Sequence, residues 1–373
     1  MTTYLDLTEL SRALTIRDLT DAAQGPHAMQ LLLDDLVTAL TTAWAIPVRL
    51  VRTPPIVAVA DNYDGLGYDP GDITRDARYT RYLSPTVMLR SHTTADIPVV
   101  LRRHALVSQG DSIDELIVVP GLVYRRDVVD RIHAGEPHQV DLWRLRSAAD
   151  LGAADLLEMI DRLVAAVLPG ARWRTTPARH PYTVDGCQVD VLLGDEWLEL
   201  AECGRIAPNV LRGAGLDPAR WSGLALGLGL DRALMLRKGI PDIRYLRADD
   251  PRAVGQLLDL TPWRPVSALP AVRRDLSVVI EDDTDDETLG DLVRAALRDR
   301  ADDIESVHVT ARTPYADLPE TARGRLGIVP GQTNAVVRLV IRPLTCTLTA
   351  AAANSIRNDV YLAIHRGPHA ELA

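Results

Sequence analysis

The chain has 373 residues, a formal net charge of −10 at pH 7 and 25% charged side chains. That length suits two or three domains with a sizeable core, and no apolar run is long enough to cross a bilayer. The acidic balance argues against a protein that coats nucleic acid, although a local arginine patch could still bind one RNA. The three cysteines lack the spacing of metal ligands or of a disulfide framework, and the first residues lack the pattern of a signal peptide. We therefore expect a protein of the reducing cytoplasm that does not enter a membrane.

Hydrophobic spacing predicts the following elements, in chain order. A helical pattern runs through residues 11–46, and a second helix covers about 153–168 and stops at Pro169-Gly170. Short β-like runs lie at residues 54–60, 115–127 and 137–145, and a hairpin at 188–204 turns at Gly194-Asp195. A further strand and helix start at residue 223. Several strands with few helices between them indicate an α+β fold, an antiparallel sheet with helices packed on it.

The C-terminal part has a different pattern. Residues 258–270 are rich in proline and lack periodicity, so we expect a linker there. Beyond it the predicted order is strand, helix, strand, strand, helix, at residues 274–281, 287–301, 304–312, 334–344 and 347–365. This order is most of a ferredoxin-like split βαβ unit whose last strand is short or missing. We therefore expect a domain at 1–257, a linker at 258–270 and a second domain at 271–373.

Two arginines stand out because of their surroundings. Arg232 follows a segment in which glycine alternates with leucine, and a buried guanidinium with no carboxylate evident nearby is costly. A phosphate is the expected partner. Gly227 and Gly229 would let a flat ring approach the strand closely, and Arg125 lies in "PGLVYRRD", which we expect to be a strand. An isolated arginine in a strand usually forms a surface ion pair. Arg125 and Arg232 together, next to a flat apolar strand surface, instead predict a site for a nucleotide triphosphate that does not use a P-loop.

Several longer segments resemble one known family, the class II phenylalanyl-tRNA synthetases of the alpha-subunit type. The segments are "MLRSHTT" (88–94), "VVPGLVYRRDVVDRIHAGEPHQVD" (118–141), "WLELAECGRIAPNVL" (197–211) and "GLALGLGLDRALMLRKGIPDIR" (223–244). The region after the linker resembles the ferredoxin-fold anticodon-binding domain of that family. A catalytic core and an anticodon domain in one chain resemble the single-chain, organelle-like form.

The resemblance implies an ATP- and Mg²⁺-dependent ligase of protein biosynthesis, which joins an amino acid to tRNA. Arg125 would hold the α-phosphate of ATP, Arg232 would lie along the γ-phosphate, and Asp127 would help to place adenine. His133 would lie near the phosphates. The resemblance further implies that Gly229 lies at the ATP site and that the amino acid's ammonium and carboxylate are bound by His92, Thr94, Gln139 and Asp141. We assign magnesium to Glu199. Among the basic residues of the C-terminal part, we expect Arg273, Arg274 and Arg357 to contact tRNA phosphates.

The side-chain pocket departs from the family pattern. The family's Phe-Pro-Phe run is replaced by His180-Pro181-Tyr182, and we expect these residues, with Thr183, Glu202 and Ala225, to surround the pocket. The chain has no phenylalanine at all, so the loss of pocket phenylalanines says little about specificity. Glu202 and Arg205 replace a glycine and a usually apolar residue of the family. They could form a local ion pair, or Glu202 could receive a donor on a phenylalanine analogue.

The absence of phenylalanine is itself unusual. About 15 would be expected at a usage of roughly 4%, and ten tyrosines remain. We hypothesise a back-up or resistance synthetase that can be made when charging of the phenylalanine tRNA fails. The alternatives are a synthetase paralogue that adenylates a phenylalanine-like amino acid for a carrier protein or natural product without tRNA, and a non-catalytic RNA-binding regulator. The protein could be a monomer or a homodimer.

Overall fold

The structure, a computed structural model, describes residues 4–107, 112–266 and 269–368. The chain divides into two compact units. The first contains residues 1–125, 136–240 and 256–263, and the second contains residues 126–135, 241–255 and 264–373. Two stretches expected in the catalytic domain thus group with the C-terminal part, while the boundaries at 257 and 271 remain a prediction. Residues 267 and 268 of the expected linker lie outside the described residues.

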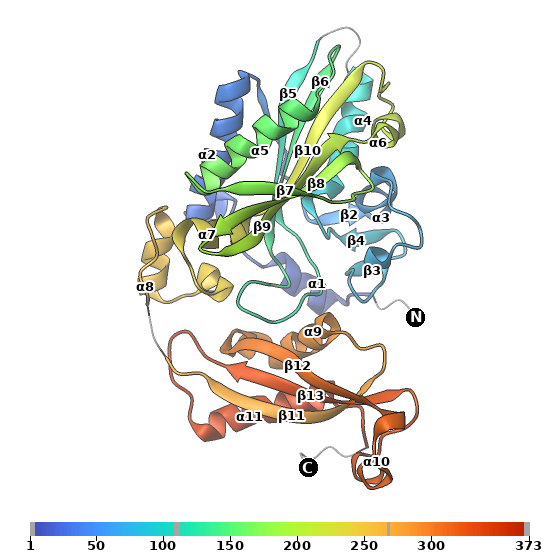
Figure 1. Cartoon of the computed structure of the whole chain (residues 1–373), viewed down its shortest axis with the longest axis vertical. Helices are drawn as coiled ribbons and strands as arrows, with labels where there is room; N and C mark the ends of the chain where they lie inside the picture. The colour runs from blue at the N-terminus through green and yellow to red at the C-terminus, as the bar shows by residue number, and fades with distance from the viewer. Residues whose placement is uncertain (1–3, 108–111, 267–268, 369–373) are drawn as a thin grey trace. The chain divides into compact units, whose positions relative to one another are not determined.

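The first unit is built on a mainly antiparallel sheet (Figure 1). In the described part of the chain its seven strands follow the order β1-β5-β6-β10-β9-β8-β7, and only the pair β1–β5 is parallel. The strands are β1 (Val48–Leu50), β5 (Asp114–Leu122), β6 (His138–Ser147), β7 (Trp173–Pro177), β8 (Thr183–Leu193), β9 (Glu196–Ile206) and β10 (Trp221–Gly229). β5 is buried along almost its whole length because both faces of the sheet are covered, which explains its continuous apolar sequence.

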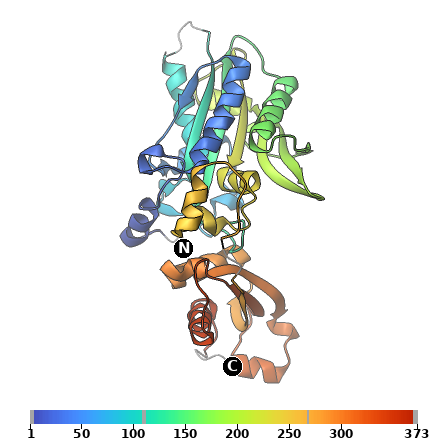
Figure 2. The same ribbon diagram turned by 90° about the vertical axis from the view of Figure 1, so that its left-hand side faces the viewer.

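Helices cover both faces of this sheet (Figure 2). α2 (Ala28–Trp44), α5 (Ala153–Val167) and α7 (Leu230–Lys238) pack against one another on one face. The opposite face packs against α4 (Ile97–Val107) and α6 (Pro208–Gly213) around a core that includes Trp143 and Ile117. The predicted apolar stripe of α2 is confirmed, since its residues Met29, Leu32, Leu33, Leu36 and Leu40 are buried. The helical pattern expected over residues 11–46 is wrong for residues 15–27, which contain no α-helix.

The turn and the glycine-rich strand follow directly from their sequences. β8 and β9 form the predicted hairpin, and Gly194 in its turn has a φ of +60°, a left-handed conformation that favours glycine. In β10, successive side chains alternate between the two faces. Leu226 and Leu228 therefore point to one face, and Gly227 and Gly229 to the other. This alternation keeps the glycine face of β10 free of bulky side chains.

The remaining elements of the first unit are small. A three-stranded sheet in the described residues has the order β2-β4-β3, from β2 (Ile56–Ala58), β3 (Tyr82–Ser84) and β4 (Val87–Leu89). The short helices are α1 (Leu7–Leu14) and α3 (Val59–Asn62), with a 3-10 helix η4 (Thr93–Asp96) before α4. No helix in the described ranges is both long and apolar enough to cross a bilayer.

The second unit contains the expected strand–helix–strand–strand–helix order, with one short helix, α10 (Glu320–Leu326), inserted between the second and third strands. Its described strands form an antiparallel sheet of order β11-β13-β12. The elements are α8 (Pro251–Val254), β11 (Val272–Glu281), α9 (Asp286–Leu297), β12 (Ile304–Pro314), α10 (Glu320–Leu326), β13 (Gln332–Ile341) and α11 (Ala350–Ile364). The core lies between this sheet and the helices α9 and α11, and Val129 of the 126–135 segment joins it.

Candidate active site

The glycine face of β10 carries the candidate site, together with the neighbouring strands. Residues directly opposite one another share a face, so the pairing defines rows across the sheet. We name each row by its β10 residue. The Gly229 row contains Gly121, Gln139 and Gly229; the Gly227 row contains Val119, Asp141, Gly227, Glu202 and Gln188; the Ala225 row contains Ile117, Trp143, Ala225 and Gly204. Five predicted site residues thus lie on one surface: Gln139, Asp141, Glu202, Ala225 and Gly229.

Asp141 is the most buried polar group of this surface, with 1% of its area exposed. Its carboxylate accepts hydrogen bonds from the hydroxyls of Thr93 (2.6 Å) and Thr94 (2.9 Å) and from the indole of Trp143 (3.0 Å). Nε2 of Gln139 lies 3.5 Å from the same group. Burial raises the pKa of Asp141, while these donors act in the opposite direction. Asp141 therefore fixes η4 and the floor of the site.

Arg125 lies at one end of the surface, beyond the end of β5 at Leu122. The expectation that it belongs to the strand is therefore wrong. Its Nε donates to the carbonyl of Ser91 (2.6 Å) and its Nη2 to Oε1 of Gln139 (3.0 Å). The chain leaves the strand before Arg125, so the side chain can reach back over the Gly229 row. The guanidinium is exposed and already oriented by both contacts.

A series of aromatic rings encloses the other side of the surface. Tyr182 is stacked on Trp143 with a centroid distance of 6.0 Å and on His180 at 5.6 Å, and Tyr68 is stacked on His92 at 5.9 Å. Tyr68 and Tyr182 are 6.4 Å apart. These rings form an aromatic cluster beside the sheet surface, and Trp143 at its base is fully buried.

Two of these aromatic residues were not predicted. Trp143 is two residues from Asp141 on a predicted strand, so period-two spacing could have placed it on the same face. Tyr68 lies outside any regular pattern, and no signal in the sequence identifies it.

His92 is held neutral in this aromatic cluster. Desolvation, helped by the charges of Arg125 and Arg90, lowers the pKa of His92 to about 3. Nε2 of His92 lies 3.4 Å from the amide nitrogen of Asn62, and Nδ1 has no hydrogen-bond partner among the described residues. A neutral imidazole with one unused nitrogen can exchange a hydrogen bond with a ligand without adding charge.

The expected pairing of Glu202 with Arg205 is wrong. Arg205 instead forms an ion pair with Asp185 (2.6 Å), which projects from an irregular part of β8. Glu202 lies beside His180 and pairs with it, with 3.3 Å between Oε2 and Nε2. His180 is oriented by the Thr183 hydroxyl, 3.1 Å from Nδ1. The proximity of His180 lowers the pKa of Glu202, so this carboxylate is ionised.

The sequence argument that Arg232 has no carboxylate partner is also wrong. Its Nη1 lies 3.7 Å from Oε2 of Glu199 on the neighbouring strand β9, and its side chain is 31% exposed. The adjacent Asp231 turns inward and accepts hydrogen bonds from the backbone and Nδ1 of His138, a buried pair that the sequence did not reveal. A Cβ added at Gly229 would meet no atom within 4 Å, so the surface beside α7 is open. The ion pair of Arg232 with Glu199 is half-exposed, and such pairs contribute little stability.

Magnesium could be accommodated here. Within the described residues there is no group of three or more His, Cys, Asp or Glu side chains arranged to hold a metal. Mg²⁺ bound with a nucleotide needs only one or two protein carboxylates, because phosphate oxygens and water complete its shell. The half-exposed carboxylate of Glu199 meets that requirement.

Asp127 and His133 belong to the second unit. Asp127 accepts a hydrogen bond from the backbone of Val128 (2.9 Å), and Nδ1 of His133 lies 2.7 Å from Asp130. The predicted tRNA-binding arginines also lie in this unit. Arg273 on β11 is exposed, Arg274 donates to Asn354 (3.0 Å), and Arg357 on α11 is half-buried.

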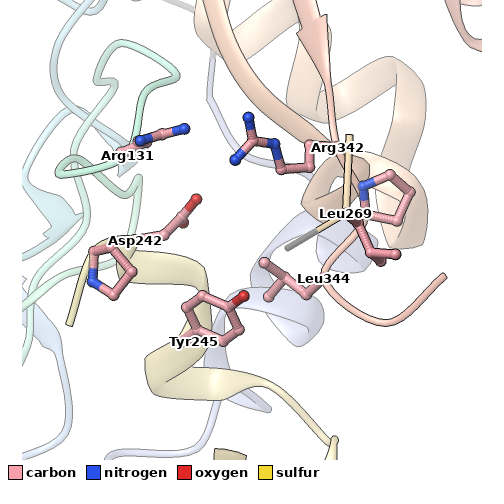
Figure 3. Close-up of a pocket in the computed structure, with 8 residues that line it drawn as sticks. Arg131, Asp242, Tyr245, Leu269, Arg342 and Leu344 are labelled. Atoms are coloured by element: carbon pink, nitrogen blue, oxygen red, sulfur yellow. The ribbon is translucent and has the colours of Figure 1, made fainter. Parts of the chain in front are cut away.

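The second unit also has a hollow of about 80 Å³, drawn in Figure 3. Arg131 and Arg342 lie on one side of it and Tyr245 on the other. Both arginines form ion pairs with Glu305, each at 2.8 Å. Small-molecule sites are usually about 300–1,000 Å³, so this hollow is too small for a nucleotide.

The antiparallel-rich sheet, its flanking helices and the oriented arginines above one face match the core fold of a class II synthetase. The family model described as "tRNA synthetases class II core domain (F)" matches residues 27–257, and the chain belongs to this family.

The curated relatives carry a consistent name. A "Phenylalanine--tRNA ligase alpha subunit" from Prochlorococcus marinus (strain MIT 9313) is 35% identical over 208 residues, 56% of this chain and 59% of the relative. The protein of the same name from Thermotoga maritima is 34% identical over 206 residues, 54% of this chain and 60% of the relative. The chain thus spans about six tenths of the length of these relatives. Among solved structures, a pyrrolysyl tRNA synthetase from Desulfitobacterium hafniense aligns with a TM-score of 0.44 and 22% identity, over 64% of this chain and 77% of that one.

Proposed function

We propose that this protein activates phenylalanine, or a close aromatic analogue, with ATP and transfers it to tRNA. The observation that carries the proposal is the cluster of aromatic rings of Tyr68, Tyr182 and Trp143 beside the sheet face over which Arg125 reaches. An aromatic cluster beside an oriented cation suits the adenylation of an aromatic amino acid. The name shared by the relatives supports the same substrate class.

In the proposed first step, the carboxylate of the amino acid attacks the α-phosphorus of ATP in line, and pyrophosphate leaves. Arg125 would bind the α-phosphate and stabilise the charge that develops on it, and Arg232 would bind the γ-phosphate. Gly229 leaves room for the nucleotide, Asp127 would help to place adenine, and His133 would lie near the phosphates. Mg²⁺, held through Glu199 and the phosphates, would supply further charge neutralisation when bound.

For the amino acid, we propose that His92, Thr94, Gln139 and Asp141 define the end of the site that holds the α-carbon groups. The side chain would lie against Tyr182, His180, Thr183, Glu202 and Ala225. Thr94 acts through its hydrogen bond to Asp141 (2.9 Å), which ties η4 to the sheet.

For the second step, we propose that tRNA contacts the second unit through Arg273, Arg274 and Arg357. Arginine contacts to phosphates supply affinity that falls as salt rises. We further propose that the C-terminal region is a ferredoxin-fold anticodon-binding domain in a single-chain, organelle-like form, and that the protein acts in the cytoplasm.

We also propose a back-up or resistance role. The chain contains ten tyrosines and no phenylalanine, so its own synthesis would not require charged phenylalanine tRNA. The test is expression while the main phenylalanyl synthetase is inhibited. The protein should accumulate and sustain growth, and a halt in its synthesis together with that of other proteins would refute this role.

A second candidate function is adenylation of an aromatic amino acid for a carrier protein or natural product, without tRNA. It is favoured by the family match to residues 27–257, which describes a core domain, because adenylation alone would need only such a core. ATP–pyrophosphate exchange across a panel of aromatic amino acids, followed by charging of total tRNA, separates the candidates. Exchange with charging supports the synthetase, exchange without charging supports the carrier reaction, and no exchange with any aromatic amino acid contradicts both.

A further inference from the structure

Two of the three cysteines lie directly opposite each other on neighbouring strands of the large sheet. Cys187 of β8 pairs with Cys203 of β9, and their sulfur atoms are 3.4 Å apart. Cys203 also lies opposite Leu226 of β10, so it faces away from the glycine face of that strand. The thiol pair therefore lies on the other side of the sheet from the candidate active site, and neither thiol takes part in the proposed adenylation.

The geometry of the pair is already close to that of a disulfide. Opposite residues of two antiparallel strands have Cα atoms about 4.5–5.5 Å apart, and disulfides span Cα separations of about 4.4–6.8 Å. The two sulfurs need only approach to about 2.05 Å for a bond to form. The pairing of β8 with β9 shifts between Val184 and Cys187. Such an irregular stretch is held by fewer hydrogen bonds than a regular ladder, so a small movement of β8 can close the gap.

The two thiols differ in reactivity. Cys203 is 2% exposed, whereas Cys187 is half-buried. The hydrogen bond with Cys203 lowers the pKa of Cys187 to about 7, and the nearby His180 acts in the same direction. The same hydrogen bond, together with burial, raises the pKa of Cys203. Because the thiolate is the form that attacks an oxidant, Cys187 reacts first, and Cys203 remains beside it as a thiol.

We infer that Cys187 and Cys203 form a redox-modification site, which hydroperoxides convert to a disulfide. The Cys187 thiolate attacks one oxygen of hydrogen peroxide and the O–O bond breaks, which gives a sulfenic acid and hydroxide. The hydroxide takes up the proton that Cys187 had released. The sulfur of Cys203 then attacks the sulfur of Cys187, the S–S bond forms, and the departing hydroxide leaves as water with the proton of Cys203. The two thiols together lose two electrons, and the peroxide is reduced to two molecules of water.

This inference goes beyond the proposed function and does not depend on it, because no substrate takes part. Disulfides inside cells are usually transient and redox-sensing, so the crosslink between β8 and β9 is expected to be reversible. Each thiol has its own task in this reaction. Cys187 is the residue that the oxidant attacks, and Cys203 is the residue that resolves the sulfenic acid.

The test is mass spectrometry of the full chain after the reduced protein has been exposed to hydrogen peroxide. Dimedone traps sulfenic acids, and iodoacetamide then caps the remaining thiols. Trypsin cleaves after Arg179 and Arg205, so both cysteines lie in one peptide, residues 180–205. In the wild type this peptide should become lighter by two hydrogen atoms and take up neither reagent. Treatment with dithiothreitol should restore two thiols that react with iodoacetamide.

Three variants separate the roles of the thiols. Cys203→Ser removes the resolving thiol, so the sulfenic acid at Cys187 should persist and its dimedone label should increase by on the order of tenfold over the wild type. Cys187→Ser should leave Cys203 as an unoxidised thiol, because it is buried and its pKa is raised. Cys346→Ser changes the exposed third cysteine, and its peptide 180–205 should behave as in the wild type.

The wild-type result alone can overturn the inference, so it does not depend on the folding of any variant. A peptide 180–205 that keeps both thiols under peroxide, a dimedone label on wild-type Cys187 in place of the disulfide, or a crosslink that involves Cys346 instead would each contradict the site. Dimedone on Cys203 in the Cys187→Ser variant would contradict the assigned order of the two thiols.

Discussion

Replacing Asp141 by alanine removes the acceptor shared by Thr93, Thr94 and Trp143, at 2.6, 2.9 and 3.0 Å. A buried donor left without a partner costs about 1–3 kcal/mol. The hydroxyls can rotate toward other acceptors, so their cost lies at the lower end of this range. The indole N–H can only donate, and its direction is fixed by the ring, so it cannot rotate toward another acceptor. We expect Asp141→Ala to lower the free energy of unfolding by roughly 3–6 kcal/mol, a large share of the 5–15 kcal/mol typical of a domain.

Urea unfolding measures this loss, followed by circular dichroism and by tryptophan fluorescence. The two signals must give coincident transitions before a free energy is assigned, because the chain has two compact units. Asp141→Asn is the matched control, since it keeps the volume and one carbonyl oxygen, and we expect it to cost about 1–2 kcal/mol. Asp141→Ala within about 1 kcal/mol of the wild type would refute the view that this carboxylate holds η4 to the sheet.

The same carboxylate predicts a dependence of stability on pH. Burial raises the native pKa of Asp141 above its ordinary value of 3.8. The folded state therefore binds the proton more readily than the unfolded state, and stability falls as the pH rises from 3.8 through the native pKa. The free energy of unfolding of the wild type, minus that of Asp141→Asn, should increase on acidification through this window. A difference that is independent of pH would show that burial does not perturb this group.

The remaining predictions concern phosphate, tRNA and thiol chemistry. Arg232→Ala should slow pyrophosphate exchange by about 10²–10³-fold through the loss of one charge-stabilising group, and activity within threefold of the wild type would make Arg232 structural. The double substitution of Arg273 and Arg274 by glutamine should leave amino-acid activation intact and raise the KM for tRNA, with a shallower salt dependence; unchanged charging would count against these residues as a tRNA contact. The thiol of Cys187 lies 3.4 Å from that of Cys203, and the hydrogen bond between them lowers the pKa of Cys187 to about 7. Alkylation of Cys187 by iodoacetamide should therefore increase steeply as the pH rises through 7. Mass spectrometry of labelled peptides, with the exposed Cys346 as the reference within the same chain, measures this profile, and a flat profile between pH 6 and pH 8 would contradict it.

Much of the scaffold could be predicted from local sequence alone. The apolar stripe of α2 and the Gly194 turn are confirmed because each depends on neighbours a few residues apart. The alternation of glycine and leucine in β10 likewise determines that one face is bulky and the other is open. The resemblance of longer segments to the synthetase family is borne out by the family match to residues 27–257.

The partners of charged groups were decided by the tertiary structure. Glu202 and Arg205 are close in sequence, yet Arg205 pairs with Asp185 and Glu202 lies beside His180. In an extended strand, residues three apart point to opposite faces, so their proximity along the chain gives no contact. The partner of Arg232, Glu199, comes from a strand that is remote in sequence and becomes a neighbour only through sheet pairing.

The two carboxylates of the Gly227 row, Asp141 and Glu202, also separate what the sequence determines from what the tertiary structure determines. The sequence by itself determined that Asp141 and Glu202 are acidic and lie on strands. Only the packing of η4 and Trp143 around Asp141 decided that its acceptors are occupied, while Glu202 stays half-exposed across a glycine. Whether a carboxylate holds the fold together or faces a ligand depends on how many donors surround it, and those donors are brought there by segments distant in the chain.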